Sequence, residues 1–512
     1  MTKRMNGLCY GDGEPIAALA TPLGESALAL VRISGGGQGG EGQGSRSSIE
    51  LLARVFSRPQ VLLSAPGNSI VHGWIIENAA GEDPGGNEKR LDEVLVSVYR
   101  APRSYTGEDG ADISCHGGIA TVKAVMAALK KAGFREALPG EFTFRAFMNG
   151  KLDLTAAESV MEIVAAKTGR ARDRALRRLA GALEEEITAI KDLLVEILAG
   201  TEIYLDYSED EFLNPEGDEE AGRLPGRKLA EEAARRLKSL SDNWRRERIY
   251  TEGALAVIAG RPNAGKSSLF NYLLTEDRSI VTDAPGTTRD WIEAVISVED
   301  IPLRLADTAG LRDISAGESQ LAPQGHGPAE NSEAERIGIN RSLELLDKAD
   351  IVLYVIDGSV GITGSDREFL SKRKAAAPWQ PLLVLWNKAD LKPPSSFAEG
   401  ERSGAFLAVS AKTGEGIPAL TASIAGLLVS ASAASKAESG EAVGPGTLRQ
   451  KELVDSSLSS VEEALALSDK GEPLDIIAPL FRMAIDALGE ITGDVYNEDI
   501  LEAMFSRFCV GK

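Results

Sequence analysis

The stretch GRPNAGKSS at residues 260–268 constrains the fold more than any other part of this chain. It fits the pattern G-x-x-x-x-G-K-[ST], follows an apolar run at 254–258 and precedes a helix-like segment at 269–274. A strand, a glycine-rich loop and a helix in this order surround a phosphate with backbone N–H groups. Lys266 would reach the β and γ phosphates, and the Ser267 hydroxyl would be a ligand of Mg²⁺. The stretch predicts a nucleotide-binding α/β domain whose contacts are Asn263, Ala264, Gly265, Lys266, Ser267 and Ser268.

Three further motifs, each after an apolar strand-like run, indicate that the nucleotide is GTP. The sequence DTAG at 307–310 supplies an aspartate for the Mg²⁺ shell and a glycine N–H for the γ-phosphate. The aspartate of NKAD at 387–390 can accept hydrogen bonds from N1 and the 2-amino group of guanine, a donor pair that adenine lacks. The sequence SAK at 410–412 is typical of the loop that packs over guanine. The expected contacts are Asp307, Thr308, Ala309, Gly310, Asn387, Lys388, Asp390, Ser410, Ala411 and Lys412.

The segment between these motifs predicts a switch, because Thr288 in GTTRD can complete the Mg²⁺ shell only when the γ-phosphate is present. Ras-type enzymes carry a water-orienting glutamine directly after the DTAG glycine, and this chain has Leu311 there. Hydrolysis therefore needs another source of charge in the transition state. Asn263 could ligate a monovalent cation at the phosphate loop, or it could simply cap the loop.

Composition places the chain among ordinary globular proteins. Its 512 residues suffice for about three domains, 43% are hydrophobic and 26% are charged. No apolar run approaches the ~18 residues of a membrane span, and no secretory core follows the start, so we expect a cytoplasmic protein without a membrane. Three cysteines and three histidines show no metal-ligand spacing. A net charge of −21 argues that any RNA contact is local or shared with a partner.

The order of segments predicts several domains. Residues 1–154 alternate short apolar runs with glycine and proline, as an α+β domain does, with a flexible insertion at 35–48. Residues 155–252 are helical, and the nucleotide domain at 253–429 is inserted before a second helical part at 430–512. Arginines at 170–178 and at 245–248 are expected on solvated helix faces. One long helix is predicted from the apolar stripe of Leu176, Leu179, Leu183, Ile187, Ile190, Leu194 and Ile197.

Several short sequences outside the nucleotide domain carry a family resemblance. They are YTGED at 105–109, CHGG at 115–118, PGEFT at 139–143, KLDL at 151–154 and the terminal FCVGK at 508–512. Together they resemble the MnmE (TrmE) family of potassium-activated, tRNA-modifying GTPases over almost the whole chain. The resemblance implies a folate-binding α+β amino-terminal domain, an all-α helical bundle and a Ras-like P-loop α/β G domain inserted in that bundle.

The resemblance also implies roles for single residues. The folate, 5-formyl- or 5,10-methylene-tetrahydrofolate, would be contacted by Arg32, Asp112, Lys151 and Lys512, although the family commonly has glutamate at the position of Asp112. K⁺ would be held by Asn263, Thr282, Ala284 and Thr287. The remaining catalytic assignments are Glu335, Lys266, Thr288 and Cys509.

Two of these assignments leave alternatives open. Glu335 would take the role that Leu311 cannot, but a Gly- and Pro-containing insertion at 314–331 precedes it and departs from the family spacing. Cys509 could attack C6 of a uridine as a thiolate, or it could only pack beside the folate.

The resemblance implies a homodimer through the amino-terminal domains and work with the FAD-dependent partner MnmG (GidA). The pair would install an aminomethyl or carboxymethylaminomethyl group at C5 of the wobble uridine of certain tRNAs. Two other functions are weighed against this one. A ribosome-assembly GTPase of the Era or Der kind requires an RNA-binding KH module or a second phosphate loop, and the sequence shows neither. A pure GTP-dependent switch predicts that folate does not bind.

Overall fold

The computed structural model describes residues 10, 14–36, 47–77, 89–206, 224–275, 293–307, 344–392, 406–432 and 443–512. Contacts divide the chain into two compact units, residues 1–161 with 488–512, and residues 162–487. The three predicted boundaries between the four segments remain predictions, because the second unit contains both helical and nucleotide-domain segments. Among the described helices, none is long and apolar enough to cross a membrane.

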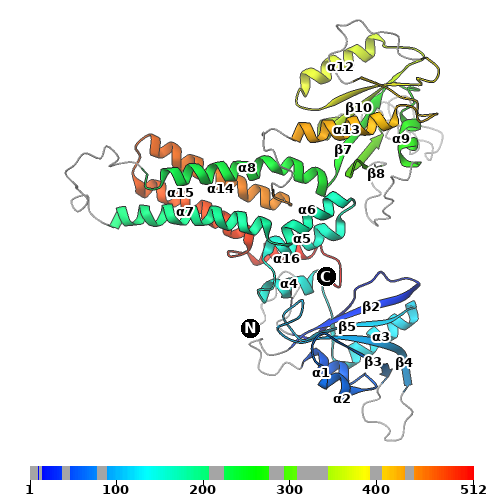
Figure 1. Cartoon of the computed structure of the whole chain (residues 1–512), viewed down its shortest axis with the longest axis vertical. Helices are drawn as coiled ribbons and strands as arrows, with labels where there is room; N and C mark the ends of the chain where they lie inside the picture. Colours follow the sequence, from blue (N-terminus) through cyan, green and yellow to red (C-terminus); the bar gives the residue numbers. More distant parts are fainter. Residues whose placement is uncertain are drawn as a thin grey trace, which may run out of the picture. The chain divides into compact units, whose positions relative to one another are not determined.

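The first unit contains a six-stranded sheet in the order β3-β4-β5-β2-β1-β6. Helices α1 (Ser48–Ala53), α2 (Pro59–Ser64) and α3 (Ile119–Ala132) pack on one face of this sheet (Figure 1). Side chains alternate between the faces of a strand, and the neighbouring Val31, Val96 and Ile113 are fully buried beneath the helices. The predicted α+β class is confirmed. The strands are β1 (Ile16–Leu19), β2 (Ser26–Ser34), β3 (Ser69–Glu77), β4 (Lys89–Tyr99), β5 (Gly110–Gly117) and β6 (Arg135–Glu136).

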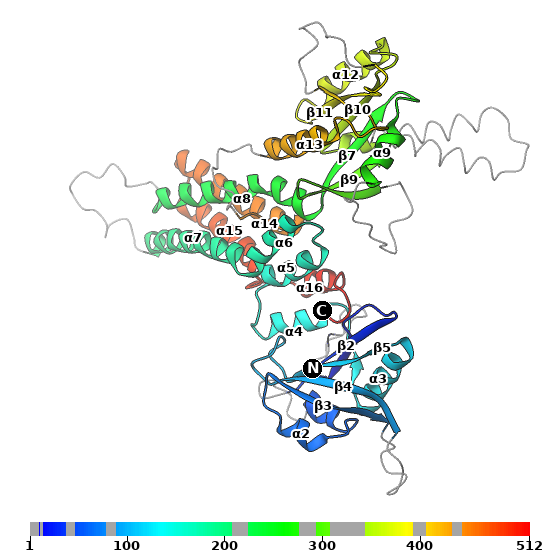
Figure 2. The same cartoon turned by 45° about the vertical axis from the view of Figure 1, so that its right-hand side comes forward.

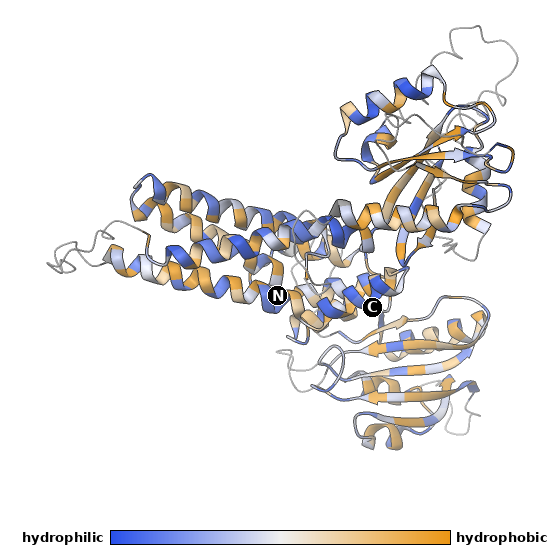
Figure 3. Ribbon diagram, turned by 45° about the horizontal axis from the view of Figure 1, so that its top comes forward, coloured by the Kyte–Doolittle hydropathy of each residue, from blue (hydrophilic) through white to orange (hydrophobic). Residues whose placement is uncertain are grey.

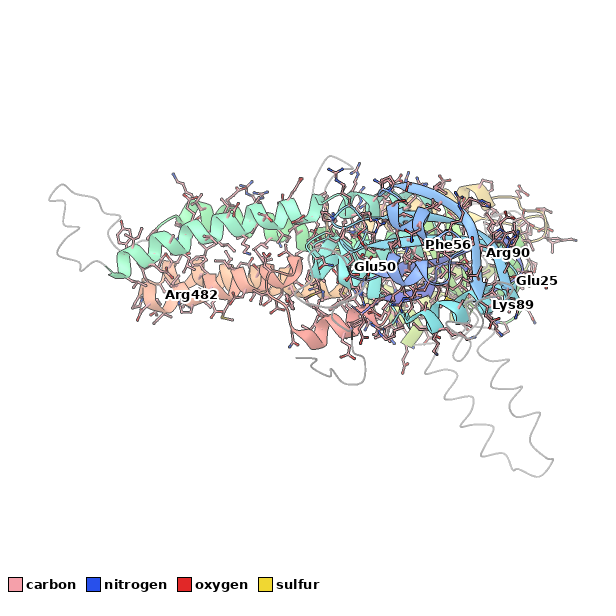
Figure 4. All side chains as sticks on the ribbon, turned by 90° about the horizontal axis from the view of Figure 1, so that it is seen from below. Glu25, Glu50, Phe56, Lys89, Arg90 and Arg482 are labelled. Carbon is pink, nitrogen blue, oxygen red and sulfur yellow. The ribbon has the colours of Figure 1, made fainter. Side chains whose placement is uncertain are left out.

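Phe56 shows how tightly this core is packed. Its side chain is 1% exposed, and a Cβ atom built on Gly73 of β3 would clash with its ring. Figure 4 labels Phe56 together with Glu50 of α1 and Arg90 of β4, whose guanidinium lies 4.9 Å from the ring centre of Trp74. Because Gly73 has no side chain, the Phe56 ring can approach the backbone of β3 more closely than any larger residue at position 73 would allow.

The predicted flexible insertion at 35–48 is wrong at its carboxyl end. Ser48 is the fully buried first residue of α1, and Ser47 is its N-cap, with Oγ accepting a hydrogen bond from Ile49 N at 3.2 Å. Serine is a good N-cap because it satisfies an unpaired helical N–H, so composition alone misplaced the boundary. The prediction is also wrong at its amino end, where Gly35 is buried and its N–H donates to Asp109 O at 3.0 Å; residues 37–46 lie outside the described residues.

The end of the chain belongs to the first unit. Helices α4 (Glu141–Met148) and α16 (Glu498–Phe505) pack together near the start of α5 (Leu154–Ala165). The terminal segment 508–512 then lies beside the start of α4, where Phe142 N donates a hydrogen bond to Lys512 O at 3.2 Å. The shared apolar cluster is Leu154, Ala157, Leu501, Phe505 and Phe508.

In the second unit, α8 (Arg227–Thr251) packs along α7 (Ala182–Asp206) and α14 (Leu448–Asp469) (Figures 1 and 2). Arg482 of α15 (Leu474–Thr492), labelled in Figure 4, forms an ion pair with Glu202 of α7.

The prediction of one long helix through the apolar stripe is wrong. The chain forms α6 (Gly169–Leu179) and α7 with a break at Gly181, whose φ of 92° suits glycine. Leu176 of α6 is 44% exposed, so it is not part of the buried apolar face. The fully buried part of the stripe is Leu183, Ile187, Ile190 and Leu194, with Ile197 at 1%.

Two arginines expected on a solvated helix face are instead packed in the second unit. Arg178 is 1% exposed and donates to Glu247 at 2.7 Å and to Glu162 at 2.8 Å. Arg174 forms an ion pair with Glu247 and lies 4.4 Å from the ring centre of Tyr250. The expectation is wrong here because partners on α5 and α8 neutralise the charges; Arg170, Arg172 and Arg177 are exposed as expected.

The second arginine cluster is also packed against other residues. The guanidinium of Arg245 lies 5.6 Å from the ring centre of Trp379, and Arg248 forms an ion pair with Asp350. The expectation of a purely solvated face is therefore wrong for these two residues of α8.

The nucleotide domain is a three-layer α/β structure with the strand order β12-β11-β10-β7-β9-β8. Helices α9 (Lys266–Thr275) and α13 (Ile417–Ser432) pack on one face of the sheet, and α12 (Gly364–Ala376) packs on the other (Figure 2). The central strands are coloured as hydrophobic in Figure 3, as expected for strands buried on both faces. The strands are β7 (Ala254–Gly260), β8 (Glu293–Val298), β9 (Ile301–Asp307), β10 (Ile351–Asp357), β11 (Leu382–Asn387) and β12 (Phe406–Ala408).

Candidate functional site

The predicted nucleotide-binding residues meet at one edge of the second sheet. Strands β7, β9, β10, β11 and β12 run parallel, so their carboxyl ends lie at the same edge. The phosphate loop follows β7, and Asp307 and Asn387 are the last residues of β9 and β11. The structure therefore brings the described parts of all four motifs together.

The phosphate loop has the backbone conformations that its glycines permit. Gly260 and Gly265 have φ values of 146° and 91°, and Asn263 adopts the left-handed region at 63°, which asparagine tolerates better than most residues. Helix α9 begins at Lys266, three residues before the predicted start. A Cβ atom on Gly265 would clash with the Asn387 side-chain amide, so this position requires glycine.

The described residues predicted to hold phosphate and metal lie at the start of α9 and at the end of β9. Lys266 is 8% exposed, and its ammonium donates to Arg261 O at 2.9 Å, across the loop. The Ser267 hydroxyl donates to Asp307 Oδ2 at 2.9 Å. A hydroxyl and a carboxylate this close provide the oxygen donors that Mg²⁺ prefers when phosphates complete its shell. Within the described ranges, no group of three or more His, Cys, Asp or Glu side chains could hold a metal by itself.

The residues predicted to recognise guanine are held in place by hydrogen bonds between loops. Asn387, 2% exposed, donates to Ala264 O at 2.9 Å and accepts from Ala411 N at 3.1 Å. The Ser410 hydroxyl donates to one oxygen of Asp390 at 2.7 Å. Asp390 remains exposed, so its carboxylate is accessible to a base, and Ser268 and Lys412 are exposed as well.

Two carboxylates that sequence reasoning missed complete the loop contacts. Lys388 donates to Asp357 Oδ2 at 2.6 Å and to Asn263 O at 3.0 Å. Asp366, fully buried, accepts from Arg261 Nε at 3.1 Å. The only sequence signal for Asp357 was its place at the end of an apolar strand, and Asp366 lies in the first turn of a helix that carried no motif.

The predicted folate residues all belong to the first unit. Arg32 and Asp112 are paired in the register of β2 and β5, and Arg32 Nε donates to Asp112 Oδ1 at 2.9 Å. Arg32 Nη1 also donates to Gly511 O at 3.4 Å, next to Lys512. Lys151 donates to Pro102 O at 3.2 Å and belongs to the same unit.

Two aromatic rings lie near the Arg32 guanidinium. Its guanidinium carbon lies 6.0 Å from the ring centre of Tyr105 and 5.9 Å from that of Phe142. Burial acts to lower the pKa of Arg32, but the hydrogen bond and the charge of Asp112 raise it overall, so the guanidinium stays charged. Cys509 is exposed, and its carbonyl oxygen accepts from Gly140 N at 3.4 Å.

Part of the predicted site lies outside the described residues. These residues are Thr282, Ala284, Thr287, Thr288, Thr308, Ala309, Gly310, Leu311 and Glu335, with the insertion at 314–331. Of the predicted K⁺ ligands, only Asn263 is described.

Comparisons with known proteins cover nearly the whole chain. Residues 154–509 match the family model described as MnmE helical domain, and residues 15–151 match the model described as GTP-binding protein TrmE N-terminus. The tRNA modification GTPase MnmE of Treponema denticola is 39% identical over 98% of this chain and 99% of the relative. That of Carboxydothermus hydrogenoformans is 37% identical over the same shares.

A solved structure of Aquifex aeolicus Era bound to GDP and AlF4⁻ shows a slight likeness. It is 21% identical, with a TM-score of 0.27, over 40% of this chain and 66% of that one. The family models and the full-length relatives, in contrast, span both compact units. The chain therefore belongs to the MnmE family of tRNA modification GTPases.

Proposed function

We propose that the protein hydrolyses GTP and, with a flavin-dependent partner, modifies C5 of the wobble uridine in certain tRNAs. One observation carries the GTPase part: a phosphate loop, a Ser267–Asp307 pair and a guanine-recognition loop meet at one sheet edge. The tRNA part rests on full-length relatives that are tRNA modification GTPases.

In this proposal each described loop has one task. The amides of the phosphate loop and the Lys266 ammonium bind the β and γ phosphates. Ser267 and the Asp307 carboxylate hold Mg²⁺, which neutralises charge on the phosphates. Asp390 accepts from N1–H and the 2-amino group of guanine, while Ser410 fixes the orientation of that carboxylate.

The proposal extends to K⁺ and to the residues outside the described ranges. Asn263, Thr282, Ala284 and Thr287 would ligate K⁺, Thr288 would complete the Mg²⁺ shell, and Glu335 would orient the attacking water. Asn263 is exposed at the phosphate loop, where an added positive charge would stabilise the transition state.

The first unit would supply the one-carbon group. Arg32 and Lys512 are cations suited to the carboxylates of a reduced folate, and Asp112 can accept from the amide and amino donors of a pterin ring. Tyr105 and Phe142 offer flat rings near the same guanidinium. The folate, 5-formyl- or 5,10-methylene-tetrahydrofolate, would deliver carbon to the uridine, with Lys151 as a further cation and with Cys509 as nucleophile or packing residue.

We also propose the assembly that the family resemblance implies: a homodimer through the amino-terminal domains that works with the flavin-dependent protein MnmG. The net charge of −21 is compatible with a partner that carries most of the tRNA contact.

Mass-spectrometric analysis of tRNA nucleosides tests the function. Cells that lack the protein are compared with cells rescued by the wild-type chain or by Asp390→Asn. We expect the C5 modification of the wobble uridine to return with wild type and not with Asp390→Asn, whose amide presents a donor to guanine. Unchanged nucleosides in the cells without the protein would refute the tRNA part while leaving GTP binding to be measured separately.

Rates of GTP hydrolysis test the cation. We expect the full-length protein to be much faster in K⁺ than in Na⁺, and Asn263→Ala to remove the difference. Equal wild-type rates in the two salts would refute the K⁺ assignment.

A further inference from the structure

Lys388 is the point where three loops of the nucleotide site are joined. It follows β11, and its ammonium reaches Asp357 at the end of β10 and the carbonyl oxygen of Asn263 in the phosphate loop. Its backbone has a φ of 62°, a left-handed conformation that costs free energy in a residue other than glycine. A long side chain placed from a strained backbone needs fixed partners to stay in one conformation.

Asp357 is a well-anchored partner for this ammonium. Its side chain is 13% exposed, and its Oδ1 accepts from Ser359 N at 2.9 Å and from Ser359 Oγ at 2.5 Å. Burial acts to raise the pKa of Asp357, but hydrogen bonds from Lys388 and Ser359 hold it below its usual value. The carboxylate is therefore charged at neutral pH, with one oxygen held by Ser359 and the other directed at Lys388.

The second anchor of Lys388 is part of the phosphate loop itself. Asn263 has a left-handed backbone, and the next carbonyl, that of Ala264, accepts from Asn387. The adjacent residues Asn387 and Lys388 thus hold two consecutive carbonyl oxygens of the loop. Loss of the Asp357 charge would leave Lys388 free to turn toward water, since its side chain is 32% exposed.

We propose that Asp357 is a positioning residue for guanine nucleotide binding. It acts through Lys388, whose ammonium it orients so that the Asn263 carbonyl, and with it the tip of the phosphate loop, keeps the conformation that receives the phosphates. Asp357 does not touch the nucleotide. The inference rests on the proposed binding of GTP and GDP, and it is independent of tRNA modification.

The test measures affinity for a fluorescent methylanthraniloyl-GDP in the full-length protein. For Asp357→Asn, which keeps the size and removes the charge, we expect about tenfold weaker binding, a change in free energy of about 1.4 kcal/mol. We expect KM for GTP to rise and kcat at saturating GTP to stay within twofold, because a bound nucleotide restores the loop. Ser359→Ala is the matched control: it removes a hydrogen bond to the same carboxylate without touching Lys388, and should change affinity less than twofold.

A double-mutant cycle separates positioning from a structural role. Lys388→Met removes the ammonium through which Asp357 acts, so Asp357→Asn should have no further effect in the Lys388→Met chain. Additive losses in affinity would refute the inference and assign Asp357 a structural role that does not act through Lys388. An Asp357→Asn affinity equal to that of wild type would refute the inference as well. If the wild-type chain itself bound no guanine nucleotide, the proposed GTPase function would fail instead.

Discussion

The turn between β8 and β9 fixes the start of α6, and Asp300→Gly tests this contact. Asp300 Oδ1 accepts from Gly169 N at 3.0 Å, and Oδ2 accepts from Arg170 N at 2.8 Å. These are the first two residues of α6, whose opening N–H groups have no partner within the helix. A residue of the nucleotide domain thus caps a helix of the helical part.

Glycine is the informative replacement because Asp300 has a φ of 64°. Alanine would add strain in this left-handed turn, whereas glycine removes the carboxylate without strain. Loss of a cap costs about 1 kcal/mol, and loss of a negative charge at a helix start costs about 0.3–1 kcal/mol. Together these predict about tenfold faster hydrogen exchange in the first turn of α6, since about 1.4 kcal/mol corresponds to a factor of ten.

Hydrogen exchange followed by mass spectrometry measures the effect on both partners. Peptides from the first turn of α6 should exchange faster in Asp300→Gly, while peptides from the β8–β9 turn should exchange at the wild-type rate or more slowly. Asp300→Asn keeps an acceptor and tolerates the left-handed backbone. Its α6 peptides should exchange at a rate between those of wild type and Asp300→Gly. The reasoning would be refuted if α6 exchanged at the same rate in all three proteins, or if both regions were equally destabilised.

Three further predictions follow from single contacts. Gly265→Ala should abolish detectable GDP binding in the fluorescence assay, because the new Cβ would clash with Asn387 and φ is 91°; retained binding would contradict the loop geometry. Arg178→Ala should destabilise the helical part by about 3–5 kcal/mol in urea unfolding, because it removes the buried guanidinium that Glu162 and Glu247 share; a loss below about 1 kcal/mol would contradict this. Burial raises the pKa of Cys115 to about 11, so iodoacetamide at pH 8 should label the exposed Cys509 and spare Cys115. Since the folded pKa is the higher one, the neutral Cys115 thiol should stabilise the fold fully below pH 9 and lose that contribution as pH rises toward 11; equal labelling at pH 8 would contradict the assignment.

The sequence could predict those parts of the site whose backbone conformation depends on a short run of consecutive residues. The phosphate loop is one example, because its glycine spacing sets the backbone and α9 follows at once. Residues 307, 387 and 410 could be placed together because each follows an apolar strand, and parallel strands end at one edge of a sheet. Helix periodicity was less reliable: it continued through Gly181, where the left-handed glycine ends one helix before the next begins.

The contacts that could not be predicted join residues distant in sequence. Arg174 and Arg178 are four residues apart and so share a helix face, but that spacing occurs equally on solvated helices. Their partner Glu247 lies 69 residues beyond Arg178, on a helix that is otherwise rich in charge. Asp300 reaches Gly169 over 131 residues. A charged residue carries the same local pattern whether it faces water or a partner, and only the packing of α6 against α8 and the β8–β9 turn decides between the two.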